Sequence, residues 1–191
     1  MPNPSSDTKP IIAHIDGGSR GNPGPAAYAV VVTSQDGTQL ASFSRYLGHA
    51  TNNVAEYEGL LAALEYALEH NHRRLKIITD SELLARQIDG QYKVRHPNLR
   101  VLHDRAQKLI AQIEAFRIES VRREHNREAD RLANEAMDAA LKHKRPALAP
   151  AAAPQILRAT ATYHQGVLDL DGSVPLGEGE RVDLKIERRK D

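Results

Sequence analysis

Residues 11–47 read IIAHIDGGSRGNPGPAAYAVVVTSQDGTQLASFSRYL, and this stretch decides the fold class. Residues 11–16 and 26–34 are rich in apolar and β-branched side chains, which favour strands, and residues 38–47 continue as a third strand. A Gly- and Pro-rich turn separates the first two runs, and the sequence QDG separates the second from the third. Three strands with such short connections predict an antiparallel meander.

The hydrophobic period changes after residue 50, from the two-residue repeat of strands to helical spacing. The predicted order βββαβααβα indicates an α/β fold of the mixed type. We expect a five-stranded sheet in which three antiparallel strands are followed by parallel crossovers, with helices on its faces. The later elements are predicted as helices at residues 54–70, 81–88, about 98–114 and 127–143, and strands at residues 74–80 and 116–121.

Composition excludes several classes of function. The 191 residues include no cysteine, which excludes disulfides, zinc–thiolate sites, iron–sulfur clusters and thiol nucleophiles. A metal would therefore bind through histidine, carboxylate or backbone oxygen. With 26 Lys and Arg against 25 Asp and Glu, the chain is not a strongly basic nucleic-acid binder. The N-terminus has no signal-like pattern and no apolar run approaches 18 residues, so we expect a cytoplasmic protein that does not span a membrane.

The chain is expected to have four parts. Residues 1–10 are polar and predict a disordered tail, and residues 11–143 form the main domain. Residues 144–155, KRPALAPAAAPQ, are typical of a semi-rigid linker. Residues 156–191 have strand-like segments around Gly-rich turns, and we expect a small β module that dimerises or docks on a partner.

Four carboxylates are candidates for a shared site. Asp16 ends the first strand and Asp80 ends the fourth, so both would emerge at the same edge of the sheet if these strands are neighbours. Glu56 lies one turn before Leu60, on the buried side of its helix, and Asp130 lies in the first turn of the last helix. Oxygen ligands without cysteine suit Mg²⁺ or Mn²⁺, and two such ions would stabilise the attacking and leaving oxygens of a phosphodiester displacement.

Each of these residues also has a simpler structural explanation. Asn53 with Glu56 is a capping-box pattern, and Asp80 is suited to cap the helix that follows it. Asp130 near a helix start is favoured by the helix dipole, and Asp16 before two glycines is typical of a turn.

Four blocks in this order resemble the signature of type 1 ribonuclease H, over roughly residues 11–141. They are DGGSRGNPGPAAYAVVV, TNNVAEYEGLLAAL, ITDSELLARQI and HNREADRLANEA. The resemblance implies an endonuclease that hydrolyses the RNA strand of RNA–DNA hybrids with two Mg²⁺ ions, for which Mn²⁺ substitutes. It also implies 5′-phosphate and 3′-hydroxyl products, and a catalytic domain that is monomeric.

The resemblance also implies site residues, position by position. The metal ligands would be Asp16, Glu56, Asp80 and Asp130. The hybrid would contact Gly17, Gly18, Ser19, Asn22, Thr51, Asn52, Asn53 and Ser81. Glycines allow a duplex to approach the backbone closely, and Asn side chains can bind the 2′-hydroxyl that distinguishes RNA from DNA.

Two departures from the family stand out. The family commonly has a catalytic histidine in a longer loop, whereas His125 lies five residues before Asp130 in a shortened segment. His125 either relays protons or assists product release, or merely lies near the helix start. Many relatives also carry a basic, Trp-rich helical handle that residues 89–104 do not resemble, so this chain is similar to the handle-lacking form.

Residues 161–188 are similar to small antitoxin-like β domains, which would imply dimerisation or partner binding, and an unrelated hairpin fits as well. Two other functions stay open at this point. One is a non-catalytic hybrid- or RNA-binding protein of the same fold, and the other is a related nuclease that also acts on double-stranded RNA.

Overall fold

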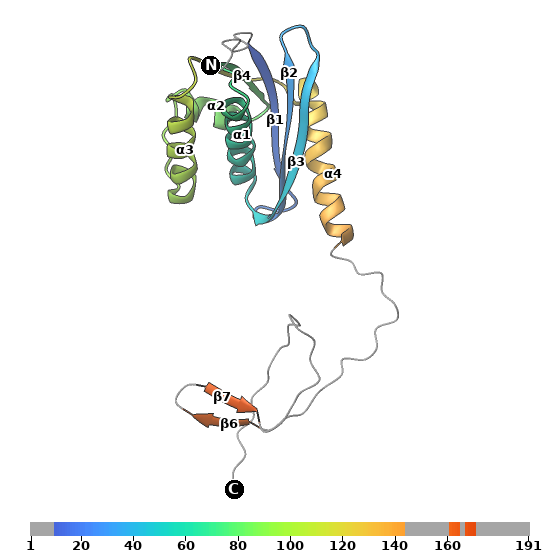
Figure 1. Cartoon of the computed structure of the whole chain (residues 1–191), viewed down its shortest axis with the longest axis vertical. Coiled ribbons are helices and arrows are strands. Elements are labelled where there is room, and N and C mark those ends of the chain that lie inside the picture. The colour runs from blue at the N-terminus through green and yellow to red at the C-terminus, as the bar shows by residue number, and fades with distance from the viewer. Residues whose placement is uncertain (1–9, 144–160, 165–166, 171–191) are drawn as a thin grey trace, which may run out of the picture. The chain divides into compact units, whose positions relative to one another are not determined.

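The computed structural model describes residues 10–143, 161–164 and 167–170 (Figure 1). The chain separates into two units, Met1–Pro146 and Ala147–Asp191. Nearly all of the predicted N-terminal tail and the whole predicted linker, residues 144–155, lie outside the described residues. The four-part organisation therefore stays a prediction.

The first unit has the element order predicted from the sequence, with one added 3₁₀ turn, η1, before the last helix. Its strands are β1 (Ile11–Ser19), β2 (Gly24–Ser34), β3 (Gln39–Ala50), β4 (Arg74–Thr79) and β5 (Ala115–Ser120). Its helices are α1 (Asn52–Glu69), α2 (Glu82–Ile88), α3 (Pro97–Ile110), η1 (Arg123–His125) and α4 (Arg127–His143).

The five strands form one mixed sheet in the order β3-β2-β1-β4-β5. The β1–β2 and β2–β3 pairs are antiparallel, whereas the β1–β4 and β4–β5 pairs are parallel. This confirms the predicted meander followed by parallel crossovers. It also places β1 at the centre of the sheet, between β2 and β4.

The connection between β1 and β2 is shorter than its composition indicates. The glycines after Asp16 predict a turn, but β1 continues to Ser19, which pairs with Ala26 of β2. Glycine lacks the side chain that packs a strand, so composition alone favours a turn at positions where the ladder of hydrogen bonds in fact continues. Asp16 therefore lies within a strand, opposite Ala29, and its interpretation as a turn residue is wrong.

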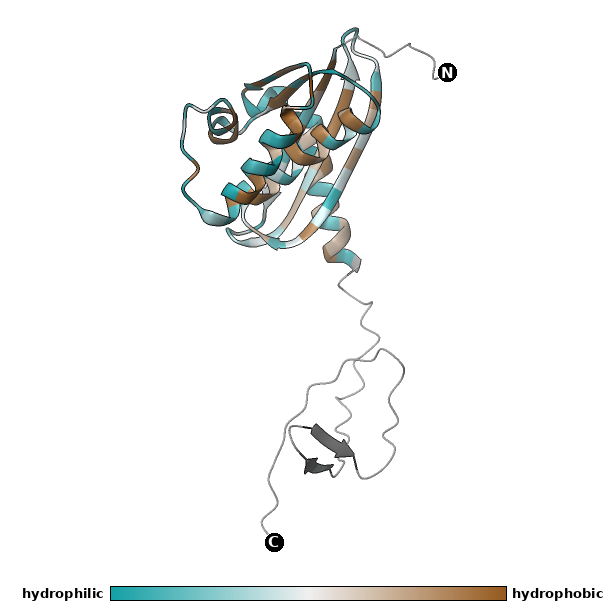
Figure 2. Ribbon diagram, turned by 60° about the vertical axis from the view of Figure 1, so that its left-hand side comes forward, coloured by the Kyte–Doolittle hydropathy of each residue, from teal (hydrophilic) through white to brown (hydrophobic). Residues whose placement is uncertain are grey.

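Helices cover both faces of this sheet (Figure 1). On one face α1 packs against β1 and β2, with α2 and α3 beside it, and on the other face α4 packs against β1, β2 and β3. Figure 2 shows these helices striped with hydrophilic and hydrophobic residues, as expected for helices with one buried face. The core between α1 and the sheet includes Ile15, Leu60, Leu64 and Ile77, each fully buried.

The described part of the second unit is a pair of short antiparallel strands, β6 (Ala161–His164) and β7 (Val167–Leu170). The rest of the predicted β module, residues 156–191, lies outside the described residues. Within the described ranges, no helix has the length and apolar character needed to cross a membrane.

Candidate active site

Asp16 and Asp80 lie side by side at the carboxyl-terminal edge of the sheet, the edge toward which the parallel strands β1 and β4 run. The parallel register of β1 and β4 pairs His14 with Ile78, and the two aspartates come two residues later on each chain. Because side chains on a strand alternate between faces, this register brings both carboxylates to the same face and the same edge. The expectation that neighbouring strand ends bring them together is confirmed.

Glu56 reaches this edge from the first turn of α1, and two neighbours hold its carboxylate. The Asn52 amide donates to Oε1 at 2.8 Å, and the Ser81 hydroxyl donates to Oε2. The helix is capped by Thr51, whose hydroxyl accepts the Val54 N–H at 3.3 Å. The capping-box interpretation of Asn53 with Glu56 is therefore wrong, since the Glu56 side chain bonds Asn52 and Ser81.

Asp80 does not cap the helix that follows it. Ser81 takes that role, because its hydroxyl accepts the Leu84 N–H at 3.3 Å. The same hydroxyl donates to Glu56, so Ser81 links the start of α2 to the start of α1. The alternative explanation of Asp80 as a helix cap is wrong, and its carboxylate is left for the site.

Asp130 comes to the same group of carboxylates from the first turn of α4. Arg123 of η1 donates to its Oδ1, and Asn134 one turn later donates to the same atom at 3.3 Å. The position in the first turn agrees with the favourable helix dipole. The Asp130 carboxylate is also close enough to Asp16 for its negative charge to raise the pKa of Asp16.

Burial and mutual repulsion perturb the two inner carboxylates. Burial, followed by the charges of Asp80, Asp130 and Glu56, raises the pKa of Asp16 from 3.8 to about 7, against the opposing charge of Arg123. Burial also raises the pKa of Glu56 from 4.5 to about 7. The Ser81 and Asn52 hydrogen bonds oppose that rise and the charge of Asp80 adds to it. Close acidic groups with raised pKa values are typical of a site that receives a cation.

The donor set fits a hard divalent cation in its chemistry. It consists of carboxylate oxygens, and the raised pKa values of the two inner carboxyls mean that binding of a cation would be accompanied by release of protons. As they stand, no three His, Cys, Asp or Glu side chains of residues 10–143, 161–164 and 167–170 are arranged to hold a metal ion.

Of the residues expected to contact substrate, Asn22 lies in the β1–β2 connection and Thr51, Asn52 and Asn53 at the start of α1, whereas Gly17, Gly18 and Ser19 end β1 and Ser81 precedes α2. Asn22 accepts the backbone N–H of Asn52 at 3.2 Å, which joins the two segments. The Ser19 hydroxyl donates to the Gly21 carbonyl at 2.6 Å. Thr51, Asn52 and Asn53 at the start of α1 are partly exposed.

Gly17 and Gly18 differ sharply in their surroundings. A Cβ atom on Gly17 would lie 2.2 Å from the Glu56 backbone nitrogen, so this glycine lets α1 approach β1 closely. A Cβ atom on Gly18 would meet the end of the Met137 side chain at 3.5 Å, an ordinary contact. The structure therefore explains Gly17 by packing beside Glu56.

His125 ends η1 and its side chain is 70% exposed. Its Nε2 atom lies 3.9 Å from Glu124, and in the described part of the chain no hydrogen bond joins it to the four carboxylates. The structure thus brings His125 near the start of α4 and leaves its catalytic role a prediction.

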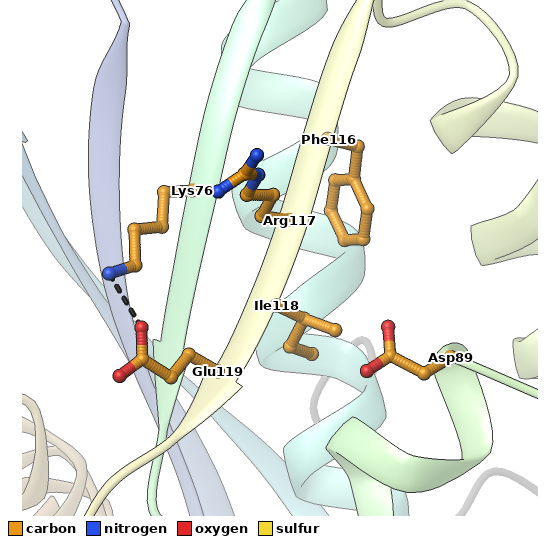
Figure 3. A pocket seen from close by; sticks show the side chains of 6 residues that line it. All are labelled: Lys76, Asp89, Phe116, Arg117, Ile118 and Glu119. Carbon is orange, nitrogen blue, oxygen red and sulfur yellow. Dashed lines mark ion pairs between the residues drawn. The ribbon is translucent and has the colours of Figure 1, made fainter. Parts of the chain in front are cut away.

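The cavity shown in Figure 3 lies elsewhere, at the free edge of the sheet along β5. Its volume is about 340 Å³. Phe116 and Ile118 point to one side of β5, whereas Lys76 and Glu119 form a 2.6 Å ion pair on the other (Figure 3). Asp89 and Arg117 complete its lining. None of the candidate site residues lines it, so it is separate from the carboxylate site.

Two residues of the site have no counterpart in the sequence predictions. Arg123, in an exposed run of charged residues, gives no sequence signal for its ion pair with Asp130. Asn126 is 1% exposed, and its amide donates to the Ile15 carbonyl at 2.8 Å. Its place four residues before Asp130, one helical turn, is the signal that could have identified it.

Comparison with known proteins agrees with this fold. Residues 14–136 match the model of the family described as reverse transcriptase-like. The chain belongs to this family. Within it, the homologues of the chain include ribonucleases HI, and its first unit is an RNase H-like domain.

Two curated relatives show the extent of the similarity. A bifunctional protein of Mycobacterium tuberculosis is 48% identical over 131 residues, which is 68% of this chain and 36% of the relative. Ribonuclease HI of Halobacterium salinarum is 43% identical over 128 residues, 67% of this chain and 64% of the relative. The chain thus matches about a third of the mycobacterial protein and less than two thirds of the halobacterial one.

Solved structures of RNase H-like domains superpose on the first unit. The N-terminal RNase H domain of a M. tuberculosis protein has a TM-score of 0.69 and 45% identity, covering 72% of this chain and 99% of that one. RNase H1 of H. salinarum has a TM-score of 0.66 and 42% identity, covering 68% and 98%. LC11-RNase H1, solved in complex with an RNA/DNA hybrid, has a TM-score of 0.66 and 40% identity, covering 69% and 99%.

Proposed function

We propose that this chain is a metal-dependent endoribonuclease that hydrolyses the RNA strand of RNA–DNA hybrids and leaves 5′-phosphate and 3′-hydroxyl ends. The observation that carries the proposal is the convergence of Asp16, Glu56, Asp80 and Asp130 from four elements. It is supported by relatives named ribonuclease HI and by the LC11-RNase H1 complex with a hybrid. We place the enzyme in the cytoplasm, in line with its bacterial and archaeal homologues.

The four carboxylates are proposed as the ligands of two Mg²⁺ ions, with Mn²⁺ as a substitute. Bound there, the ions would activate a water molecule and stabilise the leaving oxygen of the scissile phosphodiester. The chain's own groups prepare the ligands for this. Asn52 and Ser81 orient the Glu56 carboxylate through their hydrogen bonds, and Arg123 neutralises Asp130 in the metal-free protein.

The surface beside the carboxylates is proposed to bind the hybrid. Gly17, Gly18 and Ser19 form the end of β1, from which a duplex would reach Asp16. Hydroxyl and amide groups at this surface can donate and accept hydrogen bonds, as recognition of a 2′-hydroxyl requires. They belong to Ser19, Asn22, Thr51, Asn52, Asn53 and Ser81. Asn52 bonds Glu56 through its amide and Asn22 through its backbone, which ties this surface to the site.

His125 is proposed to transfer a proton or assist product release, for which its exposed position at the start of α4 is suited. Residues 156–191 are proposed as a module that dimerises or binds a partner, whereas the catalytic unit is monomeric. The paired strands β6 and β7 support a β structure for part of this module.

A cleavage assay tests the function directly. End-labelled RNA–DNA hybrid, double-stranded RNA and double-stranded DNA are incubated with the full chain, with Mg²⁺ or with EDTA. We expect cleavage of the RNA in the hybrid, restored by Mn²⁺ and abolished by EDTA or by Asp16→Asn. Binding of hybrid without cleavage would instead indicate a non-catalytic binding protein, and equal cleavage of double-stranded RNA would indicate the broader nuclease. Cleavage retained in Asp16→Asn would contradict the site assignment.

A further inference from the structure

Asn126 is a buried polar residue that the proposed mechanism does not use. Its side chain is almost completely enclosed, with 1% exposure. The Nδ2 atom donates to the Ile15 carbonyl at 2.8 Å, across 111 residues of sequence. In the described part of the chain the Oδ1 atom makes no hydrogen bond of good geometry, but the Asn126 side chain lies close enough to His14 of β1 to oppose the lowering of the His14 pKa by burial. The amide of Asn126 therefore has both of its polar contacts with β1.

Both ends of this hydrogen bond lie next to a candidate ligand. Ile15 directly precedes Asp16 on β1, one residue beyond the last β1–β4 pair, His14 with Ile78. The Asn126 backbone carbonyl accepts the Asp130 N–H at 3.1 Å, which starts the first turn of α4. The bond thus joins the strand that carries one carboxylate to the helical turn that carries another.

The buried residues in the first two turns of α4 are small. Ala129 and Ala133 are fully buried, and the larger Met137 reaches the sheet one turn later. A directional hydrogen bond supplies what such packing lacks, since it depends on both distance and angle.

We propose that Asn126 is a positioning residue that sets the first turn of α4, and with it Asp130, against β1 beside Asp16, and so determines the affinity of the site for Mg²⁺. The inference rests on the proposed function. Partners that hydrogen-bond a metal ligand directly typically change metal affinity by about 10- to 100-fold when they are removed. Asn126 acts through the backbone next to Asp16 and Asp130, so we expect an effect at the lower end of this range.

The competing explanation is that Asn126 merely satisfies the Ile15 carbonyl where the β1–β4 ladder ends. Both roles predict some loss of stability on substitution, so metal binding must be measured separately from unfolding. Asn126→Leu is suitable because leucine keeps nearly the same shape and removes the polar contacts with Ile15 and His14. Gln107→Leu is the matched control, since Gln107 also donates a side-chain amide to a backbone carbonyl, that of Ile88, at 3.0 Å and away from the carboxylates.

The test measures Mg²⁺ binding to the full chain by isothermal titration calorimetry, unfolding by urea in EDTA, and hybrid cleavage as a function of Mg²⁺. We expect Asn126→Leu to weaken Mg²⁺ binding about tenfold and to raise the Mg²⁺ concentration for half-maximal cleavage in parallel. Gln107→Leu should bind Mg²⁺ within twofold of the wild type, whatever its stability.

Mg²⁺ affinity within twofold of the wild type in Asn126→Leu would overturn the inference and leave the nuclease proposal intact. A wild-type chain that neither binds Mg²⁺ nor cleaves hybrid would overturn both. If Asn126→Leu does not fold, Asn126→Ser, whose side chain is too short to reach Ile15, replaces it. If neither variant folds, Asn126 is a folding residue and the inference fails.

Discussion

At the scale of single residues, Asp16 carries the largest electrostatic cost in the domain's site. It is 8% exposed and faces three other carboxylates, with Arg123 as an opposing charge. Folding raises its pKa from 3.8 to about 7, so between these values the folded state binds more protons than the unfolded chain. The stability associated with this group is fully present below about pH 4 and is lost as the pH rises through 7.

Asp16→Asn should therefore stabilise the metal-free protein at high pH. Because asparagine does not ionise, we expect the variant to exceed the wild type by up to about 4 kcal/mol at pH 8 in EDTA, and by nothing near pH 4. Urea unfolding at both pH values measures the difference. Glu114→Gln, which neutralises an exposed carboxylate after α3, is the control and should show no comparable gain at pH 8. A wild-type advantage at pH 8 would contradict the electrostatic account.

Substitution of Asp16 is expected to change stability and activity in opposite directions. Asp16→Asn should gain stability and lose hybrid cleavage entirely, because a neutral amide cannot replace an anionic ligand. Circular dichroism and the cleavage assay on one preparation measure both. Loss of activity together with loss of fold would mean that the carboxylate has a structural role.

At the scale of elements, the contact between β1 and α1 brings Asp16 and Glu56 to one edge. It depends on Gly17, whose position against the Ala55 and Glu56 backbone leaves no room for a side chain. The atoms in the way are main-chain atoms, which cannot rotate aside as the end of a flexible side chain can. The close approach of β1 and α1 therefore requires glycine at position 17.

Gly17→Ala should consequently push α1 away from β1. We expect a loss of roughly 1–3 kcal/mol in unfolding free energy and a fall in hybrid cleavage, because Glu56 moves with the helix. Gly18→Ala is the matched variant, since its new methyl group meets Met137 at an ordinary 3.5 Å, and its stability should change by less than about 1 kcal/mol. Equal effects in the two variants, measured by urea unfolding, would argue against the packing explanation.

At the scale of the whole molecule, the two units differ in the groups that they contribute to the candidate site and to the core. The four carboxylates, their hydrogen-bond partners and the main core all belong to Met1–Pro146. The described strands of the second unit, β6 and β7, contribute none of these groups. The chemistry of the proposed enzyme therefore depends on the first unit.

A chain truncated after Arg145 should fold and cleave hybrid at saturating substrate within about twofold of the full-length rate, because its site and core are complete. It should also elute as a monomer on size exclusion. The full chain, compared on the same column and in hybrid-binding measurements, shows whether the C-terminal module dimerises or adds affinity. An unfolded or inactive truncation would show that the second unit is needed for the first.

The sequence predicts the order and type of every strand and α-helix in the first unit, because their hydrophobic periods are strong and local. It also predicts that Asp16 and Asp80 meet, since this follows from the parallel pairing of two strands. The caps at Thr51 and Ser81 differ from the prediction because several nearby residues are equally suited to cap. The contact of Asn126 with Ile15 spans 111 residues, and local pattern does not determine such a partner.

The placement of Asp16 on the first strand and Asp130 on the last helix has a consequence during translation. A ribosome must release almost the whole domain before these two carboxylates can meet, because α4 ends at His143. Every shorter nascent chain lacks one of the four acids or the helix that carries it. The proposed active site is thus completed only when α4 has been synthesised, and no shorter nascent chain can hold all four carboxylates in place.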